Sequence, residues 1–237
     1  MDLLISDIHL GSPLFDLEEQ LISLLSDDKY KRVFIIGDLI DSWEKDLTEI
    51  IEENKRVIDC INESKKFIMI IKGNHDPSID MLKGIFPGRS IYLNYSIDFG
   101  NKTAILTHGH EFNFMITKTL SLTKLLFPFQ WASERLGFNL NGKLRDLYHS
   151  VASKMQHKKY NELVFGIEKK AAERYSEYDV IIMGHTHKEK LVKLSPTKYY
   201  VNTGSFVHWP VYTEFVNDSF VTKRIKGVNY DEYTVQN

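Results

Sequence analysis

The chain contains a single cysteine, Cys60, so an internal disulfide bond is excluded. Cys60 lies among the apolar residues Val57, Ile58 and Ile61, and a free cysteine in such surroundings is most often a small core residue. This composition excludes the disulfide-rich secreted domains and fits a reducing compartment. We therefore expect a cytoplasmic protein.

Long apolar runs are also missing. No stretch approaches the roughly 18 to 20 uncharged apolar residues that a membrane span requires. The first apolar run, Leu3-Leu4-Ile5, leads directly into Asp7, without a basic segment or a cleavage site, so no signal peptide is expected. We predict a soluble protein, with peripheral contact at the inner membrane face as an open alternative.

Neither sign of charge dominates, because the formal net charge is −2 over 237 residues. This balance excludes a globally basic nucleic-acid binder. Basic residues nevertheless gather between 112 and 160, where eight Lys and Arg stand against two acidic residues, after an apolar and aromatic start. With no repeat or flexible linker in view, we expect one domain over 1–237 with a helical cap inserted at 112–174.

The first third of the chain alternates apolar runs with amphipathic segments. This alternation predicts an α/β fold in which helices cover a largely parallel sheet. Two further strands are expected to pair around Gly100-Asn101, and the strand-rich segments after 189 predict a second, stacked sheet. The expected strands of the first part are 3–6, 33–36 and 67–71, and the expected helices are 16–25, with Asp16 as N-cap, and 46–62.

Five short polar clusters each end an apolar run, and they contain six of the nine histidines. A single histidine after a strand is more often a satisfied polar residue than a ligand, and one Gly-Asp or Gly-Asn pair is compatible with a simple turn. Five such clusters in succession instead predict a metal site built at strand ends. The clusters are Asp7-Ile8-His9, Gly37-Asp38-Leu39-Ile40-Asp41, Gly73-Asn74-His75-Asp76, Thr107-His108-Gly109-His110 and Gly184-His185-Thr186-His187.

The spacing within two clusters indicates which ions they suit. Asp7 and His9 are two residues apart, so on an extended backbone both side chains point to one side. A carboxylate beside an imidazole suits a transition-metal dication better than Ca²⁺. His185 and His187 repeat the spacing, which along a strand lets each reach a different ion of a pair about 3.5–4 Å apart. The other predicted ligands are Asp38 as a bridging carboxylate, Asn74 and His108.

The order of these motifs resembles the calcineurin-like metallophosphoesterase superfamily over residues 5 to about 206, including the turn Asn202-Thr203-Gly204-Ser205. The resemblance implies a four-layer α/β/β/α sandwich of two mixed sheets, with two divalent ions at one edge. Mn²⁺ is the first expectation, and Fe or Zn²⁺ stay open. It also implies His75 as general acid, polarised by Asp41. One ion would be held by Asp7, His9, Asp38 and His187, and the other by Asp38, Asn74, His108 and His185.

Within the superfamily, the chain is most similar to the UDP-2,3-diacylglucosamine pyrophosphohydrolases of lipid A synthesis. The total length, the segment from Gly37 to Trp43 and a helical insert after His108 carry this likeness. Two positions depart from that group, which usually has Arg in place of His75 and Asp in place of His110. His75 restores the general pattern of the superfamily, so a different phosphodiester or pyrophosphate substrate stays open.

The expected reaction is in-line attack on phosphorus by a hydroxide that bridges two metal ions. The substrate is expected to be an anionic phosphate compound, lipid-linked in the main hypothesis. The alternative is a phosphodiesterase or nuclease, and no stable nucleic-acid or protein partner is predicted. The apolar start of the cap indicates either cap core or a lipid-binding, membrane-contacting surface. The predicted phosphate contacts share one helix face, the alternative being a solvated face: Lys154, His157 and Lys158.

Overall fold

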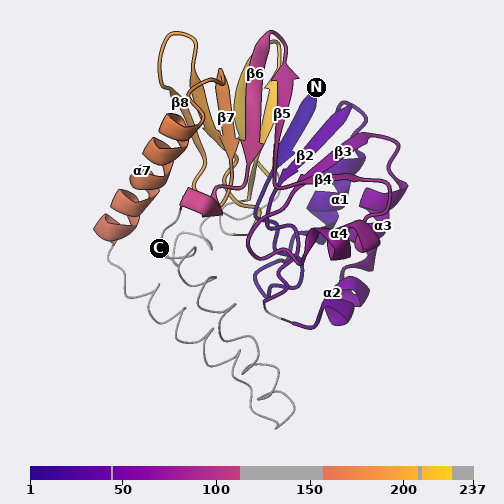
Figure 1. The fold of residues 1–237 in the computed structure, drawn as a ribbon. Helices are drawn as coiled ribbons and strands as arrows, with labels where there is room; N and C mark the ends of the chain where they lie inside the picture. The colour runs from indigo at the N-terminus through magenta and orange to yellow at the C-terminus, as the bar shows by residue number, and fades with distance from the viewer. Residues whose placement is uncertain (44, 113–156, 208–209, 226–237) are drawn as a thin grey trace. The chain divides into compact units, whose positions relative to one another are not determined.

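The computed structural model describes residues 1–43, 45–112, 157–207 and 210–225, with the backbone alone for 157–165 (Figure 1). The chain divides into two compact units. The first joins Met1–Gly109 to Arg174–Asn237, and the second spans His110–Glu173. The predicted division into one domain with a cap over 112–174 stays a prediction.

The first unit contains two mixed sheets, as the α/β prediction requires. The first sheet has six strands in the order β11-β10-β1-β2-β3-β4. Strands β1 to β4 run parallel to one another, while β10 pairs antiparallel with β1 and with β11. The bounds are β1 Asp2–Ile5, β2 Arg32–Ile36, β3 Phe67–Ile71, β4 Ser90–Tyr92, β10 Val211–Val216 and β11 Ser219–Arg224.

The second sheet has five strands in the order β5-β6-β7-β9-β8. Strands β6, β7 and β9 are parallel, and the outer pairs β5–β6 and β8–β9 are antiparallel. The turn at Gly100 joins β5 to β6, as predicted. The bounds are β5 Asn94–Phe99, β6 Lys102–Thr107, β7 Val180–Met183, β8 Lys190–Lys193 and β9 Tyr199–Asn202.

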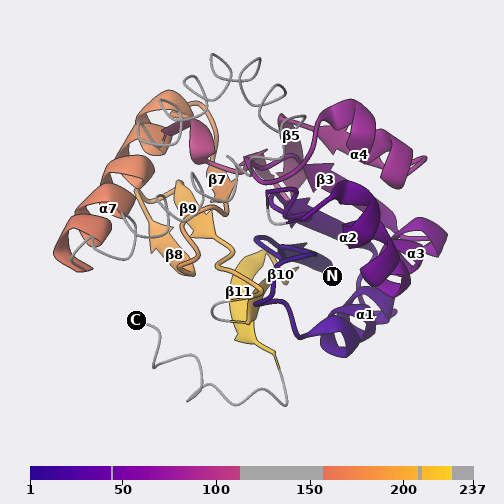
Figure 2. The same cartoon turned by 90° about the horizontal axis from the view of Figure 1, so that it is seen from below.

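The uninterrupted apolar runs of the first sheet arise because both of its faces are buried. Leu3 and Ile5 of β1 face a core shared with the helices, whereas Leu4 between them faces the second sheet. Strands β2 and β3 alternate in the same way. Figure 2 shows α1–α4 along one face of the first sheet and the second sheet along its other face. Two cores therefore hold the strand ends of this unit in place.

Helix α1 spans Glu18–Ser26, two residues later than predicted. Asp16 was wrongly predicted as its N-cap, because the cap position is Leu17, which makes no side-chain cap bond. Leu17 is buried in the helix-side core, so packing fixes where this helix begins. Glu18 and Glu19 lie in the first turn, where their negative charges interact favourably with the positive end of the helix dipole.

The helix predicted over 46–62 is two helices, α2 Leu47–Glu53 and α3 Lys55–Glu63. They meet at Asn54, whose side-chain amide donates a 2.9 Å hydrogen bond to the carbonyl of Ile50. A side chain that bonds its own preceding turn competes with the regular helix ladder, which explains the break. Helix α4, Ile79–Ile85, completes the layer, and its N-cap is Ser78, whose hydroxyl accepts from the amide of Met81.

The closing strands differ from the prediction of a purely second-sheet segment. Strands β8 and β9 do join the second sheet, but β10 and β11 return to the first, where β10 lies beside β1. Alternation alone cannot indicate which sheet a short strand joins. In the second unit, the described elements are the short 3₁₀ turn His110–Phe112 and helix α7, His157–Arg174. No helix in the described ranges is long and apolar enough to cross a bilayer.

Candidate metal centre

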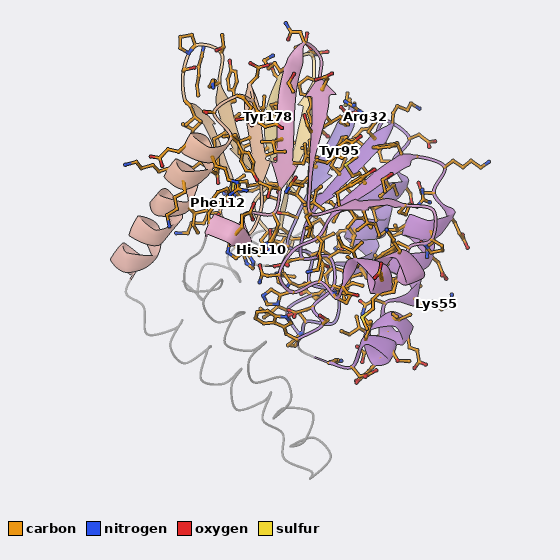
Figure 3. The ribbon with its side chains drawn as sticks, in the orientation of Figure 1. Arg32, Lys55, Tyr95, His110, Phe112 and Tyr178 are labelled. Carbon is orange, nitrogen blue, oxygen red and sulfur yellow. The ribbon has the colours of Figure 1, made fainter. Side chains whose placement is uncertain are left out.

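The predicted polar clusters lie in loops at the carboxyl ends of five strands, β1, β2, β3, β6 and β7. Arg32, labelled in Figure 3, begins β2 at the opposite end of the sheet. Within each sheet these strands are parallel, and the two sheets share a core, so their carboxyl ends meet at one edge. The loops bring together Asp7, His9, Asp38, Asp41, Asn74, His75, His108, His185 and His187.

Three groups of imidazole and carboxylate side chains lie close enough to hold metal ions. In each group the candidate ligand atoms lie within 4.8 Å of one another. His9 and Asp38 each belong to two groups, so the three groups form one continuous cluster. The groups are Asp7 with His9 and His187, His9 with Asp38 and His75, and Asp38 with His108 and His185.

Asp7 and Asp38 are each held by a backbone amide through one carboxylate oxygen. Oδ2 of Asp7 accepts from the amide of His185 at 3.1 Å, and Oδ1 of Asp38 accepts from the amide of His75 at 2.8 Å. The other oxygen of each carboxylate faces imidazole nitrogen. Oδ1 of Asp7 lies 3.1 Å from Nε2 of His187, and Oδ2 of Asp38 lies 3.1 Å from Nε2 of His108. The carboxylates are therefore oriented before any ligand binds.

Two of the predicted ligand imidazoles are oriented through Nδ1. Nδ1 of His108 lies 2.9 Å from the carbonyl oxygen of Ile36, and Nδ1 of His9 lies 2.9 Å from Oδ2 of Asp41. When Nδ1 carries the proton, Nε2 of the neutral ring keeps its lone pair. A second partner that fixes the tautomer in this way is typical of histidine ligands to metals.

Five of the predicted ligands have an uncommon backbone conformation. All five have positive φ, although none is glycine, and such conformations are uncommon and costly for side-chain-bearing residues. The prediction that Asp7 and His9, or His185 and His187, share an extended strand was therefore wrong, because β1 ends at Ile5 and β7 at Met183. Clustered strain of this kind is typical of functional sites. The values are Asp7 53°, His9 55°, Asp38 51°, His185 68° and His187 56°.

The surrounding carboxylates favour the charged forms of the imidazoles. Burial lowers the pKa of His9, but the hydrogen bond with Asp41 and the charge of Asp38 outweigh burial and raise it to about 9. Burial likewise lowers the pKa of His108, whereas the charge of Asp38 and its hydrogen bond raise it to about 10. Positive charge is therefore strongly favoured at both rings, whether it comes from a proton or from a metal ion.

The carboxylates respond in the opposite sense. Burial raises the pKa of Asp7, but the charge and hydrogen bond of His187 bring it down to about 2. Burial also acts upward on Asp38, yet the charges of His108 and His75 hold its pKa well below the usual range. Ionised carboxylates in the interior need compensating cations.

Two buried atoms identify where such cations would bind. Nε2 of His9 and Oδ1 of Asn74 make no hydrogen bond to any residue that the structure describes. A buried polar atom without a partner costs free energy, so a native site with such atoms requires an explanation. Imidazole nitrogen, amide oxygen and carboxylate oxygen together form a donor set for a transition-metal dication. The residues at this edge therefore fit bound divalent metal.

The predicted pair of Asp41 and His75 lies within the same cluster. Oδ1 of Asp41 lies 2.9 Å from Nδ1 of His75, while Oδ2 contacts His9 at the same distance. Burial raises the pKa of Asp41, but the hydrogen bonds with His75 and His9 hold it far below its usual range. One ionised carboxylate thus orients both a candidate ligand and the candidate general acid.

Asp76 was part of a predicted cluster but was not predicted as a site residue. Its buried carboxylate accepts from the amides of Asp38 at 2.9 Å, Ile40 at 2.8 Å and Gly73 at 2.8 Å. Burial and the charge of Asp38 raise the pKa of Asp76. The loops after β2 and β3 are joined by this carboxylate. An aspartate directly after the Gly-Asn-His motif was the available sequence signal.

Asn202 connects the last predicted cluster to the end of β9. Its side-chain amide donates to the carbonyl of Gly184 at 2.8 Å and to the hydroxyl of Thr186 at 3.1 Å. Its carbonyl oxygen accepts from the amide of Gly204 at 3.1 Å. Asn202 therefore fixes the loop that carries His185 without belonging to the groups of candidate ligands.

The predicted phosphate contacts are residues whose side chains lie outside the described part of the structure. Lys154 lies outside the described residues, as does most of the apolar start of the cap. His157 and Lys158 lie in the first turn of α7, where only the backbone is described. Their contact with substrate stays a prediction.

Comparison with known proteins agrees with the geometry. A model of the calcineurin-like phosphoesterase family matches residues 3–189. No curated protein sequence matches the chain. Among solved structures, an archaeal phosphodiesterase is similar, with a TM-score of 0.51, 16% identity and coverage of 94% of this chain and 98% of the other.

Two further structures are similar at a lower level. The Escherichia coli phosphoesterase Yfce has a TM-score of 0.48 and 16% identity, with coverage of 95% of this chain and 99% of its own. Vps29 from Chaetomium thermophilum has a TM-score of 0.49 and 11% identity, with coverage of 94% and 96%. At such identities, the archaeal structure supports the fold alone, and the other two carry no argument.

Proposed function

Because this chain belongs to the calcineurin-like phosphoesterase family, we propose that it hydrolyses a phosphodiester or pyrophosphate bond at the edge where the five loops meet. The observation that carries the proposal is the continuous cluster in which candidate ligand atoms lie within 4.8 Å of one another. The positive φ of five of these residues supports a selected site rather than a chance cluster of polar residues.

Two divalent ions are proposed, with Asp38 between them. Asp38 supports this role because its two oxygens face different neighbours, and because it belongs to two of the three groups. When bound, the ions supply Lewis-acid stabilisation of phosphoryl oxygens and activation of water. Mn²⁺ is the proposed occupant, with Fe and Zn²⁺ as the competing cations. One ion is assigned to Asp7, His9, Asp38 and His187, and the other to Asp38, Asn74, His108 and His185.

His75 is proposed as the general acid. Asp41 occupies Nδ1 of this ring, so Nε2 is the nitrogen that can deliver a proton to the leaving oxygen. The side chain of His75 is 22% exposed, which allows contact with a bound substrate. A positioned general acid contributes about 10²- to 10⁴-fold to the rate.

The proposed substrate is a nucleotide-linked acyl sugar of the UDP-2,3-diacylglucosamine type. The apolar and then basic composition of residues 112–160 supports it, because such a substrate combines acyl chains with phosphate. Lys154, His157 and Lys158 are the proposed phosphate contacts, and the cap is the proposed site of peripheral membrane contact. His75, where that group usually has Arg, instead favours the second candidate, a phosphodiesterase acting on nucleotides or nucleic acid.

An activity panel separates these candidates. Metal-free protein is reconstituted with Mn²⁺, Fe²⁺ or Zn²⁺ and offered bis-p-nitrophenyl phosphate, a cyclic nucleotide and a UDP-linked diacyl sugar. Release of UMP from the last compound supports the lipid-linked substrate. Turnover confined to the first two supports the nucleotide substrate. If no metal restores hydrolysis of any of these compounds, the proposed function is wrong.

A pair of matched variants tests whether the cluster is responsible. Asp38→Asn removes the proposed bridging charge, and we expect it to lose both metal binding and turnover. Asp98→Asn makes the same chemical change at an exposed position on β5 and should behave as wild type. Full activity in Asp38→Asn would place the chemistry elsewhere.

A further inference from the structure

His75 is held by three consecutive residues of the loop after β2. Asp41 contacts its Nδ1 at 2.9 Å. Ser42 holds the backbone of the same residue, because its hydroxyl and its amide both donate to the carbonyl of His75, at 2.6 and 3.1 Å. Trp43 adds a third contact, on the ring itself. Three adjacent residues of one loop thus contact a single residue of another loop, two of them through its imidazole ring.

The indole of Trp43 is stacked on the imidazole, with ring centroids 4.2 Å apart and an interplanar angle of 27°. The ring of His9 lies against the imidazole in an edge arrangement, at 4.8 Å and 78°. Offset stacked and edge contacts are the favoured geometries of aromatic pairs. A hydrogen bond through Nδ1 leaves the imidazole free to tilt about the bond direction. Stacking against a flat ring restricts that tilt.

The exposure of Trp43 argues against packing alone. The residue is 40% exposed, so a large part of this apolar ring stays in contact with solvent although deeper burial would stabilise the fold further. Phe67 offers a comparison, because it is 42% exposed and also contacts another ring, that of Phe34 at 6.1 Å. Phe67 begins β3, however, whereas His75 follows the last residue of that strand. Phe67 is therefore a matched exposed ring at the end of β3 opposite to the candidate general acid.

We infer that Trp43 is a positioning residue for His75, whose stacked indole fixes the plane of the imidazole and so the direction in which Nε2 delivers its proton. The inference rests on the proposed function, in which His75 is the general acid. Asp41 fixes one atom of the ring and Trp43 fixes the plane, so both contacts are needed for a defined orientation. Misplacement of a catalytic group by a small distance is enough to slow a reaction strongly.

The leaving group provides the test, because a general acid matters most when the departing oxygen is a poor leaving group. Two methyl aryl phosphodiesters are compared, one releasing p-nitrophenol and the other releasing phenol. We expect Trp43→Ala to lower kcat about 10- to 100-fold for the phenyl ester but less than about 3-fold for the nitrophenyl ester. KM should stay within about 2-fold for both esters, and Trp43→Phe should restore most of the rate.

Controls distinguish positioning from other roles. Phe67→Ala removes an equally exposed aromatic ring and should not distinguish the two esters. Metal content, measured for each variant, should equal that of wild type. Equal loss on both esters, unchanged rates on both, or a raised KM with unchanged kcat would each overturn the inference, the last because it makes Trp43 a substrate contact.

A second readout does not depend on turnover. In protein labelled at histidine, NMR should show the ring protons of His75, assigned with His75→Asn, shifted upfield by the stacked indole. Trp43→Ala should abolish that shift, and Phe67→Ala should leave it. Absence of the shift in wild type overturns the inference regardless of activity. If wild type hydrolyses no diester, or if His75→Ala treats both esters as wild type does, the proposed function or its general acid fails, and the NMR result alone decides whether Trp43 holds the ring.

Discussion

The carboxylate of Asp76 accepts a hydrogen bond from the backbone amide of Asp38 at 2.9 Å, deep in the loops that carry the metal centre. The same carboxylate accepts from the amides of Ile40 and Gly73. Two loops that are far apart in sequence are therefore joined at the residue proposed to bridge the ions. Disturbing this junction should move Asp38 without touching a ligand.

Asp76→Ala should weaken both the fold and the metal centre. The substitution leaves three buried amide groups without their acceptor, so we expect the free energy of unfolding to fall by about 1–3 kcal/mol. Loss of a group that orients a ligand should weaken metal affinity by about 10- to 100-fold. Urea unfolding and calorimetric titration with Mn²⁺ measure the two effects. Asp98→Ala, at an exposed position, is the control. Wild-type values for Asp76→Ala in both assays would contradict this role.

Metal binding should release protons near neutral pH. The pKa values of His9 and His108 are raised to about 9 and about 10, so both rings are protonated at pH 7.5 in the metal-free protein. Ligation requires the neutral imidazole, and about two protons should therefore leave when the centre fills. Titration calorimetry in buffers of different ionisation enthalpy counts them. His9→Asn should reduce the count by about one. Binding without proton release would show that these rings are not ligands.

The same two rings determine how the stability of the metal-free protein depends on pH. Their folded-state pKa values lie above the ordinary value of 6.5, so their stabilisation is complete below about pH 6.5 and is lost as the pH rises through 9 to 10. Chemical unfolding in the presence of a chelator should show stability falling over this range. Saturating Mn²⁺ should remove the decline, because the bound rings are already neutral. A decline of equal size with and without metal would contradict the assignment.

Asp41→Asn should impair both the catalytic rate and metal binding. Asp41 contacts both His9 and His75, whereas His75→Ala removes only the proposed general acid. We expect His75→Ala to lower kcat by about 10²- to 10⁴-fold while retaining metal. Asp41→Asn should lower kcat and also weaken metal affinity. At saturating metal, the two losses of kcat should not add in the double variant, since the remaining effect of Asp41 on kcat acts through the ring of His75. Additive losses would separate Asp41 from His75.

The sequence predicted where the site lies better than how its backbone is shaped. Apolar runs identify the buried strands, and each run stops shortly before a polar cluster such as those of Asp7 and Asp38, so the loops could be located from composition. The conformation within a loop depends on contacts that the sequence does not display. Asp7 has positive φ, and its carboxylate accepts from the amide of His185, 178 residues away. The extended geometry expected for these residues was wrong, since such long-range contacts do not appear in the local pattern.

Other differences have the same origin. The break at Asn54 depends on a side chain that bonds its own turn, and the start of α1 depends on the burial of Leu17. The placement of β10 beside β1 depends on long-range pairing, which periodicity cannot reveal. The role of Asp76 required knowing that Asp38 and Gly73 face each other. The local sequence pattern therefore identified the residues of the site, and tertiary contacts determined the partners of each residue.

Gly73→Ala should disable the metal centre through a single methyl group. A β-carbon at this position would overlap both Oδ1 and the amide nitrogen of Asp38, and backbone cannot move away cheaply. The bridging carboxylate must shift, so we expect loss of metal affinity and of turnover, with a fall in unfolding free energy of about 1–3 kcal/mol from the crowded core. Gly84→Ala is the matched control, because nothing lies within 4 Å of its added carbon in helix α4. That variant should bind metal normally and gain about 0.5–1 kcal/mol of stability from the better helix former. Metal titration and urea unfolding of both variants decide the matter, and equal metal affinity in the two would show that Asp38 tolerates displacement.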